Sequence, residues 1–338
     1  MKQLKIQKKN SPLLAAVISV ILTAALLAGC AAAPAAPDNT VTQPSASVGA
    51  ENNVTQPAAT EDKVPGPIPG MSVENYPRVD GSTANMPLMA QVYSTVCGVS
   101  LEEAETAVEV SSGTANAWFG IAYGYADLLL VYEAPQSVEA GIQGILKEEN
   151  ITLESEPMGR DGLVFLVNKD NPVDNLTSEQ LRDIYAGKIT DWSEVGGTAG
   201  PIFPYQRNED SGSQTMFLKL LMSDTEPMKP PVEWVSGSMG GLIEAVAKYD
   251  DAGGAIGFSV YYYANLMYAN PNLKLLTVDG VAPNTETIRS GDYPLLNDFF
   301  LVIRANEEAD SPARLLRDWL RTDDATGLLE EAGYVSAR

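Results

Sequence analysis

Residues 205–222 read Tyr-Gln-Arg-Asn-Glu-Asp-Ser-Gly-Ser-Gln-Thr-Met-Phe-Leu-Lys-Leu-Leu-Met, which is an arginine, a run of small residues and then an apolar pattern at helical spacing. The first N–H groups of a helix have no partner inside the helix, and the helix dipole is positive at that end. Gly212 lets an anion approach these amides closely, and Ser211 and Ser213 add hydroxyl donors. A single loop of this kind also fits an ordinary capping turn beside a solvated arginine.

Three further loops of similar composition precede predicted helices. Residues 81–83 precede a helix expected to end near Cys97, and residues 111–114 precede one expected at 115–123. The weakest case, residues 236–241, precedes a helix expected at 242–249. Several helix N-termini of this type in one chain suggest that they converge on one negatively charged group.

Short apolar runs alternate with these helices and predict buried strands at 127–132, 163–167, 255–260 and 299–303. Runs that are apolar on both faces indicate α/β layers with largely parallel sheets. In such sheets ligands bind where loops leave the carboxyl ends of the strands, and the loops described above fall at those positions.

Composition excludes several classes of function. The chain has 22 basic and 44 acidic residues, and this balance argues against nucleic acids and anionic lipid surfaces as partners. A small anion stays possible, because exposed charges more than about 8–10 Å away are largely screened in physiological salt. The chain has no histidine, which removes Ser-His-Asp and Cys-His catalysis and histidine metal sites.

We therefore expect no enzyme activity, no metal and no cofactor. The two cysteines, Cys30 and Cys97, lack a metal-binding spacing. A nucleophilic dyad of a lysine with Ser211 or Ser213 is the enzymatic alternative, but neither S-x-x-K nor G-x-S-x-G surrounds these serines.

The N-terminal part of the chain is typical of a targeting segment and a tether. Four lysines precede an apolar run at 13–27, which ends in Leu-Ala-Gly before Cys30. Residues 1–29 thus resemble a bacterial lipoprotein signal peptide, after which Cys30 becomes the lipidated first residue; an uncleaved transmembrane anchor is the alternative. Residues 30–75 are rich in Ala, Pro, Thr, Asn and Gln, so we expect a disordered linker there.

Several stretches in the second half of the chain follow one another in a characteristic order. They are Val-Asn-Lys-Asp-Asn-Pro at 167–172, Leu-Thr-Ser-Glu-Gln-Leu at 176–181, Ile-Tyr-Ala-Gly-Lys-Ile-Thr-Asp-Trp at 184–192, Asp-Gly-Val-Ala-Pro-Asn-Thr-Glu-Thr-Ile at 279–288, Gly-Asp-Tyr-Pro-Leu at 291–295 and Gly-Tyr-Val at 333–335. In this order they resemble the phosphate-binding lipoproteins of ABC importers, within the type II periplasmic-binding-protein family. The resemblance runs from about Val79 to Val335.

The resemblance implies an α/β fold of two lobes, a Venus flytrap with two interlobe crossings. Lobe I would hold residues 76–158 and 262–338, and lobe II residues 159–261. The family's anion-binding motif, Arg-x-Asp/Glu-x-Ser-Gly-Thr, matches Arg207, Glu209, Ser211, Gly212 and Ser213, with serine in place of threonine. The family's first ligand-binding loop corresponds to Ser82, Thr83 and the Ala84 amide, and its second loop corresponds to Ser112 and Thr114.

The family's acceptor carboxylate falls at Glu133, where aspartate is expected, and Asp210 stands where glycine is common. Phosphate carries a proton at neutral pH and sulfate carries none, so a carboxylate that accepts this proton's hydrogen bond favours phosphate. Leaving a buried charged group unpaired costs more than about 1–3 kcal/mol. We assign the acceptor role to Glu133 and, secondarily, to Glu209, and the fixed positive charge to Arg207.

The function implied is capture of inorganic phosphate outside the cytoplasm and its delivery to the permease subunits of an ABC transporter. The protein would act as a monomer held at the cell membrane by the lipid on Cys30. Two alternatives stay open. One is a binding protein for another oxyanion, such as molybdate, tungstate or sulfate, and the other is a phosphate-sensing or adhesive lipoprotein without transport.

Overall fold

The computed structural model describes residues 66–108, 111–248 and 254–338. The predicted signal peptide, Cys30 and most of the predicted linker lie outside these residues. The linker boundary at residue 75 is wrong, because Ile68 and Met71 are already buried in the core of the folded domain. None of the helices in the described part of the chain has the length and apolar character to cross a membrane.

The long strand β3 (Leu153–Asn168) takes part in the sheets of both lobes. In lobe I its first half pairs with β11, beyond which β2 and β1 follow, and β12 lies on its other side. The other elements of lobe I are β1 (Val79–Gly81), η1 (Thr83–Asn85), α1 (Met86–Cys97), α2 (Leu101–Ala107), α3 (Thr114–Ala122), β2 (Leu128–Val131), α4 (Gln136–Glu148), β11 (Leu296–Arg304), α9 (Pro312–Leu320), α10 (Asp323–Glu331) and β12 (Val335–Ser336).

In lobe II the second half of β3 pairs with β8 and β9, and β5 lies beside β8. Two small ribbons, β4 with β10 and β6 with β7, flank this sheet. The elements of lobe II are β4 (Asn175–Leu176), α5 (Ser178–Tyr185), η2 (Trp192–Val195), β5 (Phe203–Pro204), β6 (Gln206–Arg207), α6 (Gly212–Leu220), η3 (Val232–Trp234), β7 (Val235–Ser236), α7 (Met239–Ala247), β8 (Ala255–Val260), the π-helix η4 (Tyr263–Met267), β9 (Leu273–Leu275), β10 (Thr277–Val278) and α8 (Thr285–Ser290).

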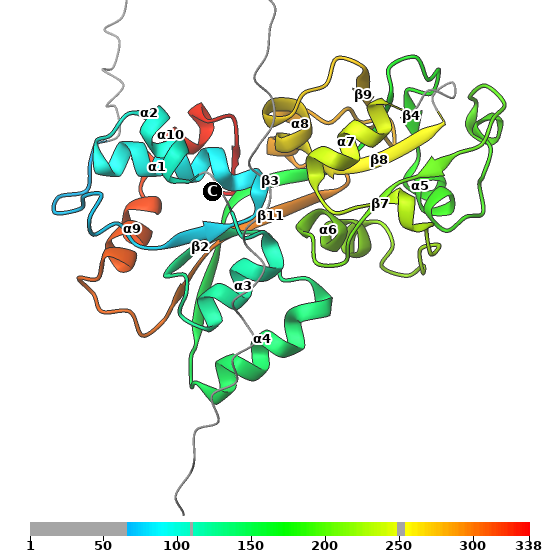
Figure 1. Ribbon diagram of the computed structural model, residues 1–338. Coiled ribbons are helices and arrows are strands. Elements are labelled where there is room, and N and C mark those ends of the chain that lie inside the picture. Colours follow the sequence, from blue (N-terminus) through cyan, green and yellow to red (C-terminus); the bar gives the residue numbers. More distant parts are fainter. Residues whose placement is uncertain (1–65, 109–110, 249–253) are drawn as a thin grey trace, which may run out of the picture. The chain divides into compact units, whose positions relative to one another are not determined.

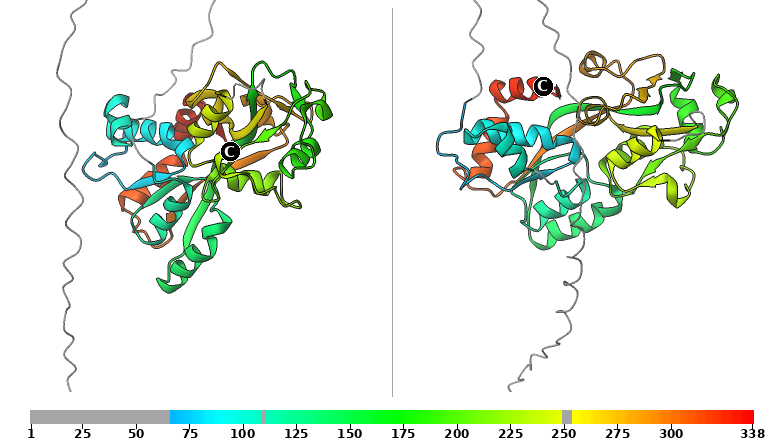
Figure 2. Two further views of the ribbon diagram at one scale, coloured as in Figure 1. Left: turned by 45° about the vertical axis from the view of Figure 1, so that its right-hand side comes forward. Right: turned by 45° about the horizontal axis from the view of Figure 1, so that its top comes forward.

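Figures 1 and 2 show this division, with α1, α2 and α10 gathered at one end of β3 and α5, α6 and α7 at the other. The two-lobed α/β fold is thereby confirmed. The sheet, however, is mixed: β1 is parallel to β2 and β5 to β8, whereas β3 is antiparallel to all four of its neighbours. Strands apolar on both faces need helices on both faces, whichever way the neighbouring strand runs, so the pattern did not reveal direction.

Strand pairing also moves one predicted lobe boundary. The resemblance places residues 262–338 in lobe I, but β9 pairs with β3 and β10 with β4, both within lobe II. The chain crosses between the lobes inside β3, near Gly162, and crosses back just before β11, near Leu295. Lobe II therefore includes β9 and β10 as well, because the chain turns back along β3 after η4. Helix α8, which follows them, also packs against β12 of lobe I, and its Arg289 pairs with Glu330 of α10.

Aromatic packing in lobe II fixes the position of α6, whose N-terminus carries the Arg-to-Ser loop. Phe217 on α6 stacks on Phe258 of β8 with ring centroids 4.5 Å apart, and Tyr185 of α5 contacts Phe217 at 4.8 Å. All three side chains are fully buried. Offset and edge-to-face pairs of this kind add about 0.5–1.5 kcal/mol beyond area burial, so they hold the helix firmly against the sheet.

Candidate functional site

Loops from both lobes line one cleft of about 460 Å³. Lobe I contributes Ser82 and Thr83 before α1, residues 111–116 around the start of α3, and Tyr132 after β2. Lobe II contributes Arg207, Asn208 and residues 210–213 at the start of α6, and residues 237–240 at the start of α7. The predicted convergence of helix N-termini is confirmed.

The start of α6 approaches lobe I closely. Ser211 caps this helix, its hydroxyl accepting a hydrogen bond from the Gln214 amide at 3.2 Å, which leaves the amides of Gly212 and Ser213 without a partner inside the helix. A Cβ atom on Gly212 would lie 2.7 Å from the Thr114 hydroxyl and 3.3 Å from the Tyr132 ring. Glycine is therefore required here for the two lobes to meet.

The N-termini of α3 and α7 complete the ring of amides. Gly113 precedes α3 with φ of 84°, a left-handed conformation that favours glycine, and no side chain caps this helix. At α7 the Ser238 hydroxyl accepts from the Gly241 amide at 3.0 Å. Since helix N-termini carry partial positive charge, all three ends favour a negative group in the cleft.

Hydroxyl groups of lobe I that line the cleft lie within hydrogen-bond distance of one another. The Ser82 and Thr114 hydroxyl oxygens lie 2.8 Å apart, and the Tyr132 amide donates to the Ser82 oxygen at 3.1 Å. The Thr83 and Ser111 hydroxyl oxygens lie 3.3 Å apart. Ser112 lines the cleft as well, but its hydroxyl donates to the Asp80 carboxylate.

Arg207 supplies a buried positive charge. The residue is 8% exposed, and its guanidinium donates to the Ser236 carbonyl at 3.0 Å, the Ser213 hydroxyl at 3.3 Å and the Gly237 carbonyl at 3.4 Å. Within the described residues no carboxylate pairs with it. Burial lowers the pKa of Arg207 to about 10, so the group still carries its charge at neutral pH. A buried charge that lacks a counter-charge favours binding of an anion.

The two predicted acceptor carboxylates lie outside this cleft. Glu133 accepts a hydrogen bond from the Lys219 ammonium at 2.6 Å, and both residues, with Glu209, line a different hollow of about 600 Å³. After the end of β2 at Val131, Tyr132 lines the cleft, whereas the next residue, Glu133, lines the other hollow. Placing Glu133 and Glu209 at the ligand was therefore wrong.

Among the described residues, Asp210 is the one carboxylate that lines the cleft, and its Oδ1 accepts from the Ser137 hydroxyl at 3.1 Å. Ala84 does not line the cleft either: it is fully buried, and its carbonyl accepts from the Tyr334 hydroxyl at 2.6 Å. The remaining predicted residues lie at the cleft: Ser82, Thr83, Ser112, Thr114, Arg207, Ser211, Gly212 and Ser213.

Sequence reasoning missed Tyr132, Asn208 and Tyr263 as lining residues. Tyr263 begins the π-helix η4, and its ring stacks on Tyr268 with centroids 5.8 Å apart. No composition signal predicts a π-helix, although such turns occur frequently at functional sites. Tyr132 ends the strand predicted at 127–132. Its position at the cleft could have been predicted only if the sequence had shown which of its side chains point toward the loops.

Comparisons with known proteins point to one family. A family model described as a PBP superfamily domain matches residues 54–321. The phosphate-binding protein PstS of Bacillus subtilis is 27% identical over 175 residues, which cover 52% of this chain and 54% of that protein, so the chain spans about half the length of that relative. The phosphate-binding protein PstS of Staphylococcus aureus is 24% identical over 234 residues, or 68% of this chain and 70% of that protein.

Solved structures share the fold. A putative phosphate ABC transporter substrate-binding protein from Clostridium perfringens, with bound phosphate, aligns with a TM-score of 0.57 and 21% identity over 78% of this chain and 100% of its own. An ABC-type phosphate transport receptor from Vibrio cholerae aligns with a TM-score of 0.55 and 24% identity over 76% of this chain and 98% of its own.

Proposed function

Because the chain belongs to the PBP superfamily, we propose that it is a solute-binding protein that captures inorganic phosphate in the cleft between its lobes. One observation carries the proposal: Arg207 is buried, has no carboxylate partner in the described part of the chain, and lies among the N-termini of α3, α6 and α7. A tetrahedral oxyanion would supply the counter-charge and accept hydrogen bonds from the guanidinium, the amides and the hydroxyls at once. Relatives named as phosphate-binding proteins support phosphate as that anion.

The site would close around its ligand. The anion contacts donors of both lobes and therefore stabilises the closed arrangement that it bridges. Three polar contacts already join the lobes beside the cleft: Ser137 to Asp210 at 3.1 Å, and Lys219 to Glu133 at 2.6 Å and to Asn297 at 3.4 Å. The close approach of Gly212 to Thr114 requires the same arrangement.

Selectivity would come from Asp210 in this proposal. A carboxylate beside the anion repels sulfate, which has no proton to donate, and accepts a hydrogen bond from protonated phosphate. Because the Asp210 side chain is exposed, water weakens this effect, and we expect a phosphate preference of about tenfold to a hundredfold.

The cellular role extends the same proposal. A lipid on Cys30 would hold the protein at the outer side of the cell membrane, where the closed form, acting as a monomer, delivers phosphate to the permease subunits of an ABC transporter. We expect no turnover of phosphate esters by the cleft.

Isothermal titration with phosphate, sulfate and molybdate tests the ligand. We expect strong heat for phosphate, and Asp210→Asn should reduce the preference over sulfate by about tenfold. Asp310→Asn, which removes an exposed carboxylate that does not line the cleft, is the matched control and should change nothing. Equal affinity for all three oxyanions would favour the general oxyanion alternative. A protein that binds none of them would refute the proposal and favour the adhesive alternative.

A further inference from the structure

A buried carboxylate lies where the chain first crosses between the lobes. Asp161 is 2% exposed and sits in β3 opposite Asn297 of β11, two residues before the pairing with β8 begins at Leu163. Arg160 beside it points to the other face of β3 and pairs with Asp298 at 3.1 Å. Asp161 thus occupies this interlobe crossing, which we call the hinge, without any ion pair among the described residues.

Hydrogen bonds from separate elements converge on this carboxylate. The Tyr132 hydroxyl donates to Oδ2 at 2.8 Å, and the amides of Gly162 and Tyr262 donate to Oδ1 at 2.8 and 3.2 Å. The titratable groups that face it are the tyrosines Tyr132, Tyr262 and Tyr334, of which the last two stack with ring centroids 3.6 Å apart. Burial raises the pKa of Asp161 to about 6, although the hydrogen bonds oppose this rise.

Tyr132 connects this carboxylate to the cleft. Its hydroxyl binds Asp161, its amide donates to the Ser82 hydroxyl at 3.1 Å, and its ring packs beside Gly212 of the other lobe. Ser82 in turn lies 2.8 Å from the Thr114 hydroxyl. A continuous set of contacts therefore runs from the hinge to donors of the candidate anion site.

We propose that Asp161 is a positioning residue of the anion site. Its ionised carboxylate fixes Tyr132, and Tyr132 in turn positions the Ser82 hydroxyl and the surface against which Gly212 of the other lobe packs. This inference rests on the proposed binding of an oxyanion. An ionised carboxylate accepts from the tyrosine hydroxyl and both amides together, through charge-assisted bonds. A protonated carboxyl group donates its own O–H to the Tyr132 oxygen or accepts from it without charge assistance, so Tyr132 is held by a weaker, neutral hydrogen bond.

The proposal predicts that the affinity for phosphate depends on pH through the titration of Asp161, in addition to the titration of phosphate itself. Phosphate changes its own protonation near neutral pH, so wild-type affinities alone are not decisive. Asn at position 161 cannot ionise and resembles the protonated carboxyl at every pH. The ratio of the dissociation constants of Asp161→Asn and wild type cancels the titration of phosphate and isolates that of Asp161.

Isothermal titration of phosphate at pH 7.5 and pH 5 measures this ratio. We expect Asp161→Asn to weaken binding about tenfold at pH 7.5 and only about twofold at pH 5. Tyr132→Phe, which keeps the carboxylate and loses the hydroxyl, should show the same fall of its ratio from pH 7.5 to pH 5. The double variant should be no weaker than either single variant. Asp298→Asn, on the opposite face of the same crossing, is the matched control and should give a ratio near one at both pH values.

Equal ratios at both pH values would overturn the inference, because a purely structural role of Asp161 does not depend on its charge. Should Asp161→Asn fail to fold, Tyr132→Phe decides the question: full affinity, or a ratio independent of pH, contradicts the inference. A wild-type protein that binds no phosphate refutes the proposed function itself, whereas strong wild-type binding with ratios that do not change refutes only the role of Asp161.

Discussion

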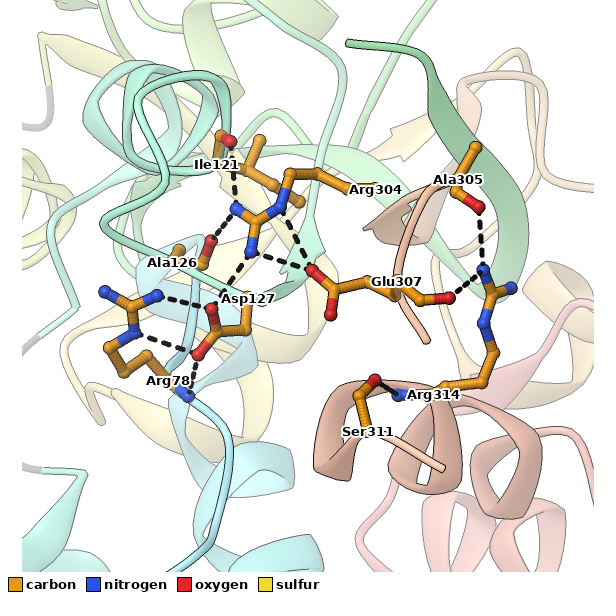
Figure 3. Close-up of polar contacts among 9 residues, drawn as sticks. All are labelled: Arg78, Ile121, Ala126, Asp127, Arg304, Ala305, Glu307, Ser311 and Arg314. Carbon is orange, nitrogen blue, oxygen red and sulfur yellow. Dashed lines mark hydrogen bonds and ion pairs between the residues drawn. The ribbon is translucent and has the colours of Figure 1, made fainter. Parts of the chain in front are cut away.

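Arg207 in the cleft and Arg304 in lobe I are two guanidinium groups held largely away from water, but the protein neutralises only one of them. The Arg304 side chain is 14% exposed and pairs with Asp127 at 3.0 Å and Glu307 at 2.8 Å, and it also donates to the carbonyls of Ile121 and Ala126 (Figure 3). Arg207 contacts carbonyl and hydroxyl oxygens but, among the described residues, no carboxylate.

The partners of Arg304 show what a completed site looks like. Burial raises the pKa of Asp127, but hydrogen bonds from Arg78 and Arg304 outweigh it and hold this pKa below its usual value. Asp127 therefore stays ionised and ties β2 to the end of β11. An internal counter-charge makes Arg304 a stabilising group of the fold, whereas Arg207, which has no counter-charge among residues 66–108, 111–248 and 254–338, would gain one from the proposed anion.

The largest expected difference is between the glutamine variants of these two arginines. Arg207→Gln should weaken phosphate binding by about a hundredfold or more, because it removes the buried charge that the anion neutralises. Its free energy of unfolding without ligand should be unchanged or higher, since an unpaired buried charge is lost. Isothermal titration and urea unfolding measure both quantities.

Arg304→Gln should show the opposite pattern. We expect the free energy of unfolding to fall by about 3 kcal/mol, because Glu307 loses its cation and Asp127 one of two. The folded protein should bind phosphate within about twofold of wild type, since Arg304 does not line the cleft. If Arg304→Gln abolished binding and Arg207→Gln only lowered stability, the comparison would be wrong.

Asp161 is a third buried ionisable group, and its effect on the free energy of unfolding should depend on pH. Its pKa in the folded protein, about 6, is raised above the ordinary value of 3.8, so the folded state holds the proton more tightly than the unfolded state. Stability from this group is present in full below pH 4 and is lost as the pH rises toward 6. Relative to Asp161→Asn, which cannot titrate, wild type should lose about 2 kcal/mol of unfolding free energy between pH 4 and pH 7.

Urea unfolding of both proteins at several pH values measures this difference. A difference that stays constant from pH 4 to pH 7 would mean that Asp161 titrates as an ordinary exposed carboxylate does. The expected loss of stability at neutral pH accompanies better anion binding, so this hinge residue would trade stability for function.

A smaller effect is expected where the lobes meet. Gly212→Ala places a Cβ atom 2.7 Å from the Thr114 hydroxyl, so closure requires a shift of α6 or of Thr114. Phosphate affinity should fall by about tenfold with little change in stability, because the open protein has room for the methyl group. Gly144→Ala is a control, since Gly144 lies in α4 with no atom near its missing Cβ. Equal affinity of both variants would contradict a closed ligand complex.

The smallest expected effect concerns the ion pair outside the cleft. Lys219→Met removes the ion pair with Glu133. Because the Lys219 side chain is 49% exposed and that of Glu133 38% exposed, phosphate affinity should change by less than about threefold. Glu133→Gln should behave alike. If Glu133→Gln lowered phosphate affinity by more than about tenfold without changing stability, Glu133 would be the hydrogen-bond acceptor for phosphate, as the sequence predicted.

Local signals predicted most of the cleft, whereas the two lobes were implied by the family resemblance. Glycine and hydroxyl residues before an apolar helical pattern are encoded within a few residues, and the loops at Ser82, Thr114 and Ser211 were found in that way. The loops at Ser82 and Ser211 follow strands β1 and β6, as expected for ligand-binding loops of α/β folds, whereas the loop at Thr114 follows helix α2.

Features that depend on distant pairing could not be predicted. Whether Tyr132 or Glu133 faces the cleft is decided by strand register, since a shift of one residue exchanges the two sides. The second lobe boundary depends on β9 and β10, which are three and two residues long and lack a strand signature. The proposed positioning role of Asp161 depends on Tyr132, 29 residues away, and on the amide of Tyr262, 101 residues away.

A crystal structure of the protein with phosphate tests the central claim most directly. We predict one tetrahedral anion whose oxygens lie about 3 Å from the Arg207 guanidinium and from amides at the starts of α3 and α6. Phosphate bound elsewhere, with Arg207 paired to a carboxylate of the chain, would contradict it.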